Sequence, residues 1–146
     1  MTTRPATLDD YEELMRLYTH LHADDQPLDE SFGRKELATI IDRSGLELLV
    51  LEHEGRLVAT IYLNIIPNLT RAGRPYAVIE NVVVDSLARQ QGFGRQIMDA
   101  TLEKAWAAGC YKVMLMTGVT NPNSHGFYRA CGFSSDAKTA YLIRHP

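Results

Sequence analysis

The residues best suited to chemistry form a glycine-containing loop that follows a short apolar run. The run Val82–Val84 leads into Arg-Gln-Gln-Gly-Phe-Gly-Arg at residues 89–95, where a helical pattern begins. Glycines let backbone N–H groups converge on an anion, and the start of a helix adds the positive end of its dipole. Arg89 and Arg95 could each donate paired hydrogen bonds to phosphate oxygens. The sequence therefore predicts a phosphate-binding loop.

Two familiar nucleotide loops fit this stretch poorly. A Walker A loop needs Gly-x-x-x-x-Gly-Lys followed by Ser or Thr, and the chain has no such run. The dinucleotide fingerprint needs a third glycine or alanine where this chain has Ile97, and an acidic residue about 20 positions further on, where residues 112–117 have none. A nucleotide-binding domain for ATP or NAD remains the alternative within phosphate chemistry.

The loop must be positioned by the elements around it. Periodic apolar residues predict helices over residues 8–21, 32–41, 94–108 and 123–131. Alternating or β-branched runs predict strands over residues 46–51, 57–66, 76–84, 112–117 and 138–144. The turn His53–Arg56 makes an antiparallel hairpin, whereas the strand–helix–strand run from 76 to 117 is a crossover that makes its strands parallel. The expected fold class is α/β (α+β) with a mixed, mostly antiparallel sheet and a central βαβ crossover.

Composition favours one ordinary globular domain over residues 1–146. The chain has 146 residues, 45% of them hydrophobic and 23% charged. Its mass is 16.4 kDa. The net charge of −3 argues against nucleic-acid binding, which calls for a basic face. With no long apolar run and no signal-peptide pattern, we expect a cytoplasmic protein that does not bind membranes.

Metal binding is also not expected. Cys110 and Cys131 lack the spacing of a zinc site. His20 and His22 are two positions apart, so they do not share a helix face, and no carboxylate completes a ligand set.

Two motifs give the chain a resemblance to a known family. The first is Arg-x-x-Gly-x-Gly from Arg89 to Gly94, and the second is Asn-x-x-x-Phe-Tyr-x-x-x-Gly-Phe from Asn123 to Phe133. In these motifs, and in the order of its elements, the sequence resembles the GNAT superfamily of acetyl-CoA-dependent N-acetyltransferases. Three stretches are locally similar to glucosamine-phosphate N-acetyltransferases: 79–84, 110–113 and 127–133. Residues 117–122 and the N-terminal third depart from that narrower pattern.

The resemblance implies a three-layer fold with helices on both faces of the sheet, a homodimer, and acetyl-CoA as cosubstrate without a metal. It implies that the cofactor contacts Val82, Val83, Val84, Arg89, Gln90, Gln91, Gly92, Phe93, Gly94, Arg95, Asn123 and Tyr128. The diphosphate would sit on the loop amides, and the pantetheine arm would pair with the strand edge. The Val82 amide would then donate to the developing oxyanion, a contact typically worth about 3 kcal/mol. Asn123 would bond the pantetheine arm or cap the short helix.

Two residues are candidates for proton transfer. An alkylamine has a pKa of about 10.4, so it arrives mostly as ammonium and needs a base. Glu80 lies two positions before Val82, and strand alternation places both side chains on one face. Tyr128 would be the general acid that serves the CoA thiolate. The competing interpretations are a surface or ion-paired Glu80 and a Tyr128 that only packs.

The acceptor is less defined than the cofactor. The expected reaction is direct attack on acetyl-CoA by a primary amine of a small molecule, in a ternary complex. Residues 9–36 carry nine acidic and three basic side chains, and Asp24, Asp25, Asp29 and Glu30 could attract a cationic acceptor such as a polyamine, an aminoglycoside or a protein amine. Arg71 and Arg74 could instead hold an amino-sugar phosphate. A non-catalytic CoA-binding module is the remaining alternative.

Overall fold

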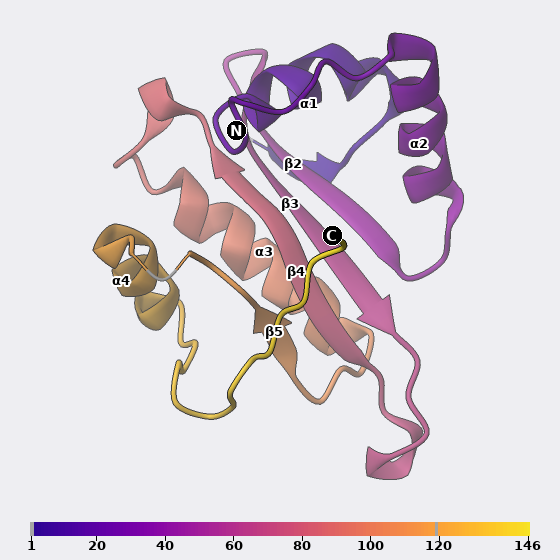
Figure 1. Ribbon diagram of the computed structural model, residues 1–146, viewed down its shortest axis with the longest axis vertical. Helices are drawn as coiled ribbons and strands as arrows, with labels where there is room; N and C mark the ends of the chain where they lie inside the picture. Colours follow the sequence, from indigo (N-terminus) through magenta and orange to yellow (C-terminus); the bar gives the residue numbers. More distant parts are fainter. Residues whose placement is uncertain (1, 119) are drawn as a thin grey trace. The chain divides into compact units, whose positions relative to one another are not determined.

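The computed structural model describes residues 2–118 and 120–146 (Figure 1). The chain forms two compact units, one that runs to Met116 and one at Thr117–Pro146. The first unit contains the sheet and most of the helical residues. Each unit is described by itself below.

The first unit contains a five-stranded sheet in the order β1-β2-β3-β4-β5. Its strands are β1 (Thr2–Pro5), β2 (Leu46–His53), β3 (Arg56–Ile66), β4 (Tyr76–Val84) and β5 (Val113–Leu115). Neighbouring strands are antiparallel, except that β4 and β5 are parallel. The predicted hairpin is the β2–β3 pair, and the predicted crossover joins β4 to β5. The mixed, mostly antiparallel sheet is therefore confirmed.

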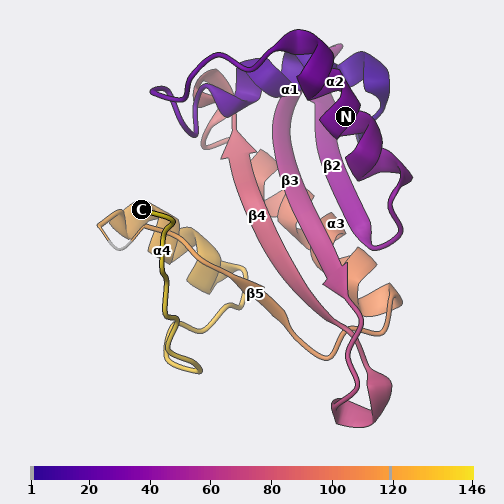
Figure 2. The same cartoon turned by 45° about the vertical axis from the view of Figure 1, so that its right-hand side comes forward.

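Helices cover both faces of this sheet (Figure 2). They are α1 (Tyr11–Tyr18), α2 (Glu30–Asp42) and α3 (Phe93–Ala107). Leu17 of α1 and Leu37 of α2 form one buried cluster with Leu48 and Val50 of β2. Because side chains alternate along a strand, Leu49, which lies between Leu48 and Val50, points to the other face, where α3 contacts β2, β3 and β4. Along the described chain, no helix has the length and apolar character to cross a membrane.

A capping box precedes the first helix, which ends earlier than expected. Thr7 and Asp10 form a capping box, and the Thr7 amide donates to Asp10 Oδ2 at 2.7 Å. A 3-10 turn then leads into α1, which ends at Tyr18 and does not reach Leu21. The Thr19 hydroxyl donates to the Arg16 carbonyl at 2.7 Å, which satisfies one of the terminal carbonyls. The predicted helix over 8–21 is therefore too long.

The second unit contains one helix, α4 (Pro122–Ala130), followed by residues without regular structure. The predicted strand over residues 138–144 is wrong. Tyr141 and Ile143 are 93% and 95% exposed, and no strand pairs with this stretch among the described residues. Alternation alone does not make a strand, because its backbone must also pair with a neighbour.

Candidate active site

An irregularity in β4 sets the geometry of the candidate site. Opposite β3, the register moves by two residues from Tyr62 to Thr60, while β4 moves by three from Glu80 to Val83. β4 thus holds one extra residue at this point, which is a β-bulge. Asn81 has a φ of 51°, in the left-handed region that asparagine tolerates better than most residues. The bulge therefore interrupts the strand immediately after Glu80.

The bulge corrects the expectation that Glu80 and Val82 share a face. Residues opposite one another in an antiparallel pair point to the same side, and Thr60 and Tyr62 are two positions apart on β3. Their partners Val83 and Glu80 therefore share the face that α1 and α2 cover. Because of this extra residue, the side chains of Glu80 and Val82 point to opposite faces of the sheet.

The second half of β4 is open along one edge. β5 pairs only with Ala77, Val78 and Ile79. From Glu80 to Val84, no strand pairs with the edge away from β3 in the described part of the chain. An extended ligand could therefore hydrogen-bond this backbone as an added strand. The role of Val82–Val84 in binding pantetheine stays a prediction.

The glycine loop connects β4 to α3. Gly92 is the N-cap of α3 with a φ of 82°, a conformation that glycine adopts without strain. Since Gly92 has no side chain, it offers no side-chain oxygen to cap the helix, and its carbonyl accepts a hydrogen bond from the Gln96 amide of the next turn. The amides of Phe93–Arg95 thus stand at the positive end of a 15-residue helix. This geometry suits the predicted diphosphate site.

The charged and polar side chains of the loop differ in their contacts. Arg95 Nε donates to both carboxylate oxygens of Asp99, at 2.8 and 2.9 Å, within α3. Arg89, Gln90 and Gln91 are exposed. The Arg95 pair lies at the surface, where such pairs contribute little, so an incoming phosphate could compete for this guanidinium.

A hollow of about 440 Å³ lies beside Glu80. Its lining residues come from β2, β3 and β4: Leu46, Tyr62, Asn64, Ile65, Ile66, Val78, Glu80 and Asn81. The side-chain Nδ2 of Asn64 donates to the Val78 carbonyl at 3.3 Å. Burial raises the pKa of Tyr62, and the positive charge of Arg43 opposes this rise. An exposed carboxylate and a phenol thus border a space that can hold a small molecule.

The sequence did not reveal the β3 side of this hollow. Local patterns place Tyr62 and Asn64 in a strand and no more, because their proximity to Glu80 depends on the register of the β3–β4 pair. That register includes the bulge. The useful signal was Asn81 itself, since asparagine is enriched at left-handed positions.

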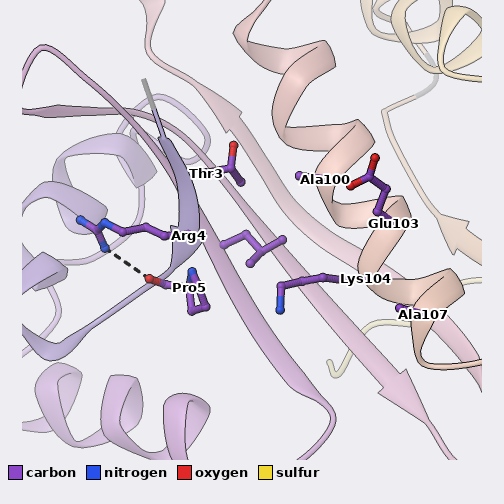
Figure 3. A pocket seen from close by; sticks show the side chains of 8 residues that line it. Thr3, Arg4, Pro5, Ala100, Glu103, Lys104 and Ala107 are labelled. Carbon is purple, nitrogen blue, oxygen red and sulfur yellow. Dashed lines mark hydrogen bonds between the residues drawn. The ribbon is translucent and has the colours of Figure 1, made fainter.

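A second hollow of about 340 Å³ lies between β1 and α3 (Figure 3). Thr3, Ala100, Glu103 and Lys104 are among its lining residues. Lys104 Nζ is paired with Glu47 at 3.1 Å, and the Thr3 hydroxyl oxygen is buried without a hydrogen-bond partner in the described residues. None of the predicted site residues lines this hollow, so the candidate site is the hollow beside Glu80.

The arginines suggested for an anionic acceptor have other contacts. Arg74 donates to the carbonyls of Gly109 and Cys110, both at 3.4 Å. The Arg71 guanidinium lies 5.9 Å from the centre of the Tyr111 ring. Both side chains thus join the loop before β4 to the segment between α3 and β5.

The acidic residues suggested for a cationic acceptor are divided in their roles. Asp29 caps α2 by accepting a hydrogen bond from the Phe32 amide at 2.9 Å. Glu30 pairs with Arg34 at 2.8 Å. Asp24 and Asp25 are exposed in the segment between α1 and α2. At least two of the four suggested acids therefore stabilise α2.

Tyr128 lies in the second unit, on α4. Its half-buried ring is 5.2 Å from that of Phe127 and 6.1 Å from that of Phe133, measured between centroids. Burial raises the pKa of Tyr128, and Cys131 adds to the rise, so the phenol is protonated at neutral pH. It can therefore donate a hydrogen bond.

Asn123 is not the N-cap of α4. That position belongs to Asn121, whose side chain accepts from the amides of Asn123 and Ser124 at 3.1 and 3.4 Å. Pro122 occupies the first helical turn, where its missing N–H costs nothing. The alternative structural role suggested for Asn123 is therefore wrong, and its contact with the cofactor stays a prediction.

Comparison with known proteins identifies the family. The sequence profile of the acetyltransferase (GNAT) family matches residues 9–133. The chain therefore belongs to the GNAT family and is an acetyltransferase. Acetyltransferases of this family use acetyl-CoA.

Individual relatives agree with this assignment. The chain is 39% identical over 112 residues to the glucosamine 6-phosphate N-acetyltransferase of Trypanosoma brucei brucei, which covers 73% of this chain and 74% of the relative. A solved structure from Agrobacterium tumefaciens, assigned as an acetyltransferase, is 41% identical with a TM-score of 0.95 and covers 99% of this chain and all of that one. The glucosamine-6-phosphate N-acetyltransferase of Arabidopsis thaliana has a TM-score of 0.86 at 24% identity, which shows the shared fold; the match covers 99% of this chain and 97% of that one.

Proposed function

We propose that the protein transfers the acetyl group of acetyl-CoA to a primary amine of a small molecule, by direct attack in a ternary complex. The observation that carries this proposal is the open half of β4, which ends in a glycine loop and borders a hollow that contains Glu80. The family match extends from residue 9 to residue 133 and so includes most of the first unit and the first part of the second. This supports the expectation that residues 1–146 act as one acetyltransferase domain.

Acetyl-CoA binds along the open edge and at the loop in this proposal. The diphosphate accepts hydrogen bonds from the amides of residues 91–95 at the start of α3, with Arg89 and Arg95 adding positive charge. The pantetheine arm pairs with the backbone of Val82–Val84. The Val82 amide donates to the oxyanion that forms when the amine attacks the thioester carbonyl.

Glu80 is the proposed general base. It lines the hollow, and its side chain is exposed, so an amine bound there can reach it directly or through one water. Removal of the ammonium proton leaves the nitrogen lone pair available for attack. The carbon–sulfur bond then breaks, and CoA leaves as a thiolate.

Tyr128 is the proposed hydrogen-bond donor to the departing sulfur. A thiol has a pKa of about 8.5 and a tyrosine of about 10, so full proton transfer to the thiolate is uphill. The raised pKa of Tyr128 makes this transfer harder still. Stabilisation of the thiolate by a hydrogen bond is therefore the role that the phenol fits best.

An amino-sugar phosphate is the acceptor class we favour. Curated relatives are glucosamine 6-phosphate N-acetyltransferases, and the hollow beside Glu80 has room for a monosaccharide. The charge of Arg43 acts at Tyr62 in the wall of this hollow and would favour an anion there. A cationic amine is the second candidate, supported by exposed Asp24 and Asp25.

A thiol-release assay with acetyl-CoA tests the proposal. We expect CoA release that depends on glucosamine 6-phosphate, with glucosamine a poorer acceptor and spermine inactive. Activity with spermine alone would favour the cationic class. No amine-dependent thiol release across a panel that includes amino sugars, polyamines and aminoglycosides would contradict the proposed reaction.

A further inference from the structure

A buried carboxylate stands where β4 passes into the glycine loop. Asp85 is 3% exposed and follows the last residue of β4. Its amide donates to the Val58 carbonyl at 2.8 Å, which fixes the backbone of Asp85 against β3. A buried carboxylate is costly unless charges and hydrogen bonds compensate for its lost hydration. The groups that contact Asp85 therefore stabilise the start of the loop.

Arg16 of α1 is the main charged partner of Asp85. Arg16 Nη1 donates to Asp85 Oδ2 at 2.6 Å, across 69 positions of sequence. Its Nη2 donates to the Leu57 carbonyl of β3 at 2.7 Å, and its Nε donates to Glu13 at 2.9 Å. One planar guanidinium thus joins α1, β3 and the first residue of the loop, an arrangement that a lysine ammonium reproduces poorly.

The remaining neighbours of Asp85 are more distant. Arg56 Nη2 and His20 Nε2 each lie 3.9 Å from one of its carboxylate oxygens. Arg56 is about half exposed, so its charge is screened by water. The short contact with Arg16 therefore dominates the charged contacts of this carboxylate.

Asp85 in turn holds the first turn of the loop. Its Oδ1 accepts from the Leu87 amide at 3.0 Å, and its carbonyl accepts from the Ala88 amide at 2.9 Å. These bonds form the 3-10 turn Ser86–Ala88, which directly precedes the exposed residues 89–92. The direction in which the loop leaves β4 therefore depends on the position of one carboxylate.

We propose that Arg16 is a positioning residue for acetyl-CoA, because it holds Asp85 and thereby aims the glycine loop at the diphosphate. This inference rests on the proposed function, in which residues 91–95 bind that diphosphate. Arg16 itself lies in α1 and touches Asp85 and β3. Its effect should thus be specific to the part of the cofactor that contacts the loop.

Two thioesters separate this role from a general loss of structure. Acetyl-CoA contains the diphosphate, whereas S-acetylpantetheine carries the same reacting thioester without it. The measured quantity is kcat/KM for acetyl-CoA divided by kcat/KM for S-acetylpantetheine, at a fixed amine concentration. A lower folded fraction reduces both values equally, so the ratio reports only the contribution of the nucleotide part.

We expect Arg16→Met to lower this ratio by about tenfold, since small displacements of binding groups have effects of this order or larger. Asp85→Asn keeps an oxygen that can accept from the Leu87 amide but loses the charge that pairs with Arg16. It should lower the ratio similarly, and the double variant should lower it no further. Arg34→Met is the matched control, because Arg34 is an exposed helix arginine paired with Glu30, and the ratio should stay at the wild-type value.

The outcomes distinguish the inference from the function on which it rests. A wild-type chain without preference for acetyl-CoA over S-acetylpantetheine would contradict both. A wild-type preference that Arg16→Met and Asp85→Asn leave intact, whatever their thermal stability, would overturn the positioning role alone. If Arg16→Met does not fold, the ratio in Asp85→Asn decides.

Discussion

The two halves of β4 have the same strand character but different surroundings. The first half, through Ile79, is hydrogen-bonded to β3 on one edge and to β5 on the other. The second half, Glu80–Val84, begins with a bulge and pairs along one edge only, among the residues that the structure describes. The first half therefore completes the sheet, while the second presents backbone donors and acceptors to a ligand.

The difference shows how one strand supports both stability and chemistry. Ile79 is 1% exposed, whereas the adjacent Glu80 is exposed and lines a hollow. The change occurs within one residue because successive side chains of a strand point to opposite faces, and the bulge follows directly after Glu80. Substitutions in the first half should thus reduce stability, and substitutions in the second half should reduce activity.

The largest expected effect is on turnover, at Glu80. Glu80→Gln keeps the size of the side chain but removes the base, so kcat should fall by about 100-fold or more at neutral pH. The measurement is thiol release at saturating acetyl-CoA and amine. Glu36→Gln, at an exposed position of α2, is the control and should leave kcat unchanged. Wild-type turnover in Glu80→Gln would remove this carboxylate from the mechanism.

The next effect is on stability, at Ile79. Ile79→Ala removes a buried side chain that packs opposite Leu63, and should lower the free energy of unfolding by about 3 kcal/mol. The KM for acetyl-CoA should change by less than about twofold where the variant is folded. Urea unfolding and steady-state kinetics measure the two quantities. A large rise in the KM for acetyl-CoA without loss of stability would contradict the proposed division of β4 into a stabilising first half and a ligand-binding second half.

A pH effect is expected from Tyr18, which packs over the cluster that contains Val83. Burial raises the pKa of Tyr18 from 10.0 to about 12, and a hydrogen bond with Thr60 only partly opposes the rise. Because the folded pKa is the higher one, its stabilising contribution is complete below pH 10 and is lost as the pH rises from 10 to 12. The loss amounts to roughly 3 kcal/mol.

Tyr18→Phe tests this assignment. The variant lacks the phenol, so its free energy of unfolding should fall less steeply than that of the wild type over the same pH interval. Urea titrations across the interval measure both slopes. Parallel curves would show that other groups cause the alkaline loss.

The smallest expected effect on stability is at Gly92. The Cβ added by Gly92→Ala would have no atom within 4 Å. The loss in the free energy of unfolding therefore comes from the positive φ and should be about 1 kcal/mol. The same strain should displace the loop amides and raise the KM for acetyl-CoA. Gly126→Ala, in α4 with equal space around it, should be neutral or stabilising and should not change this KM. Equal kinetic behaviour of the two variants would contradict a role for the loop backbone.

Local patterns predicted the elements that position the site. The β4 strand has the bounds expected from its apolar run, and α3 begins at Phe93, one position before the expected start. Strong periodicity and the glycines of the loop made these boundaries readable. The antiparallel hairpin followed from turn residues between two β-branched runs.

Features that depend on partners distant in sequence could not be predicted from the sequence. β1 was missed because Thr2–Pro5 is too short to show a period and contains a proline. The bulge, the Tyr62–Glu80 register and the Arg16–Asp85 ion pair join segments whose alignment only the folded chain defines. The alternating residues 138–144 gave the opposite error, since a pattern without a pairing partner forms no strand.

Amide hydrogen exchange with and without CoA tests the division of β4 most directly. The amides of Ala77–Ile79 lie in a strand paired on both edges, so their exchange should be slow in either state. Added CoA should slow the exchange of amides in Val82–Val84 and at the start of α3, at Phe93–Arg95. Binding of CoA that leaves both of these segments unchanged, and protects another surface instead, would contradict the account.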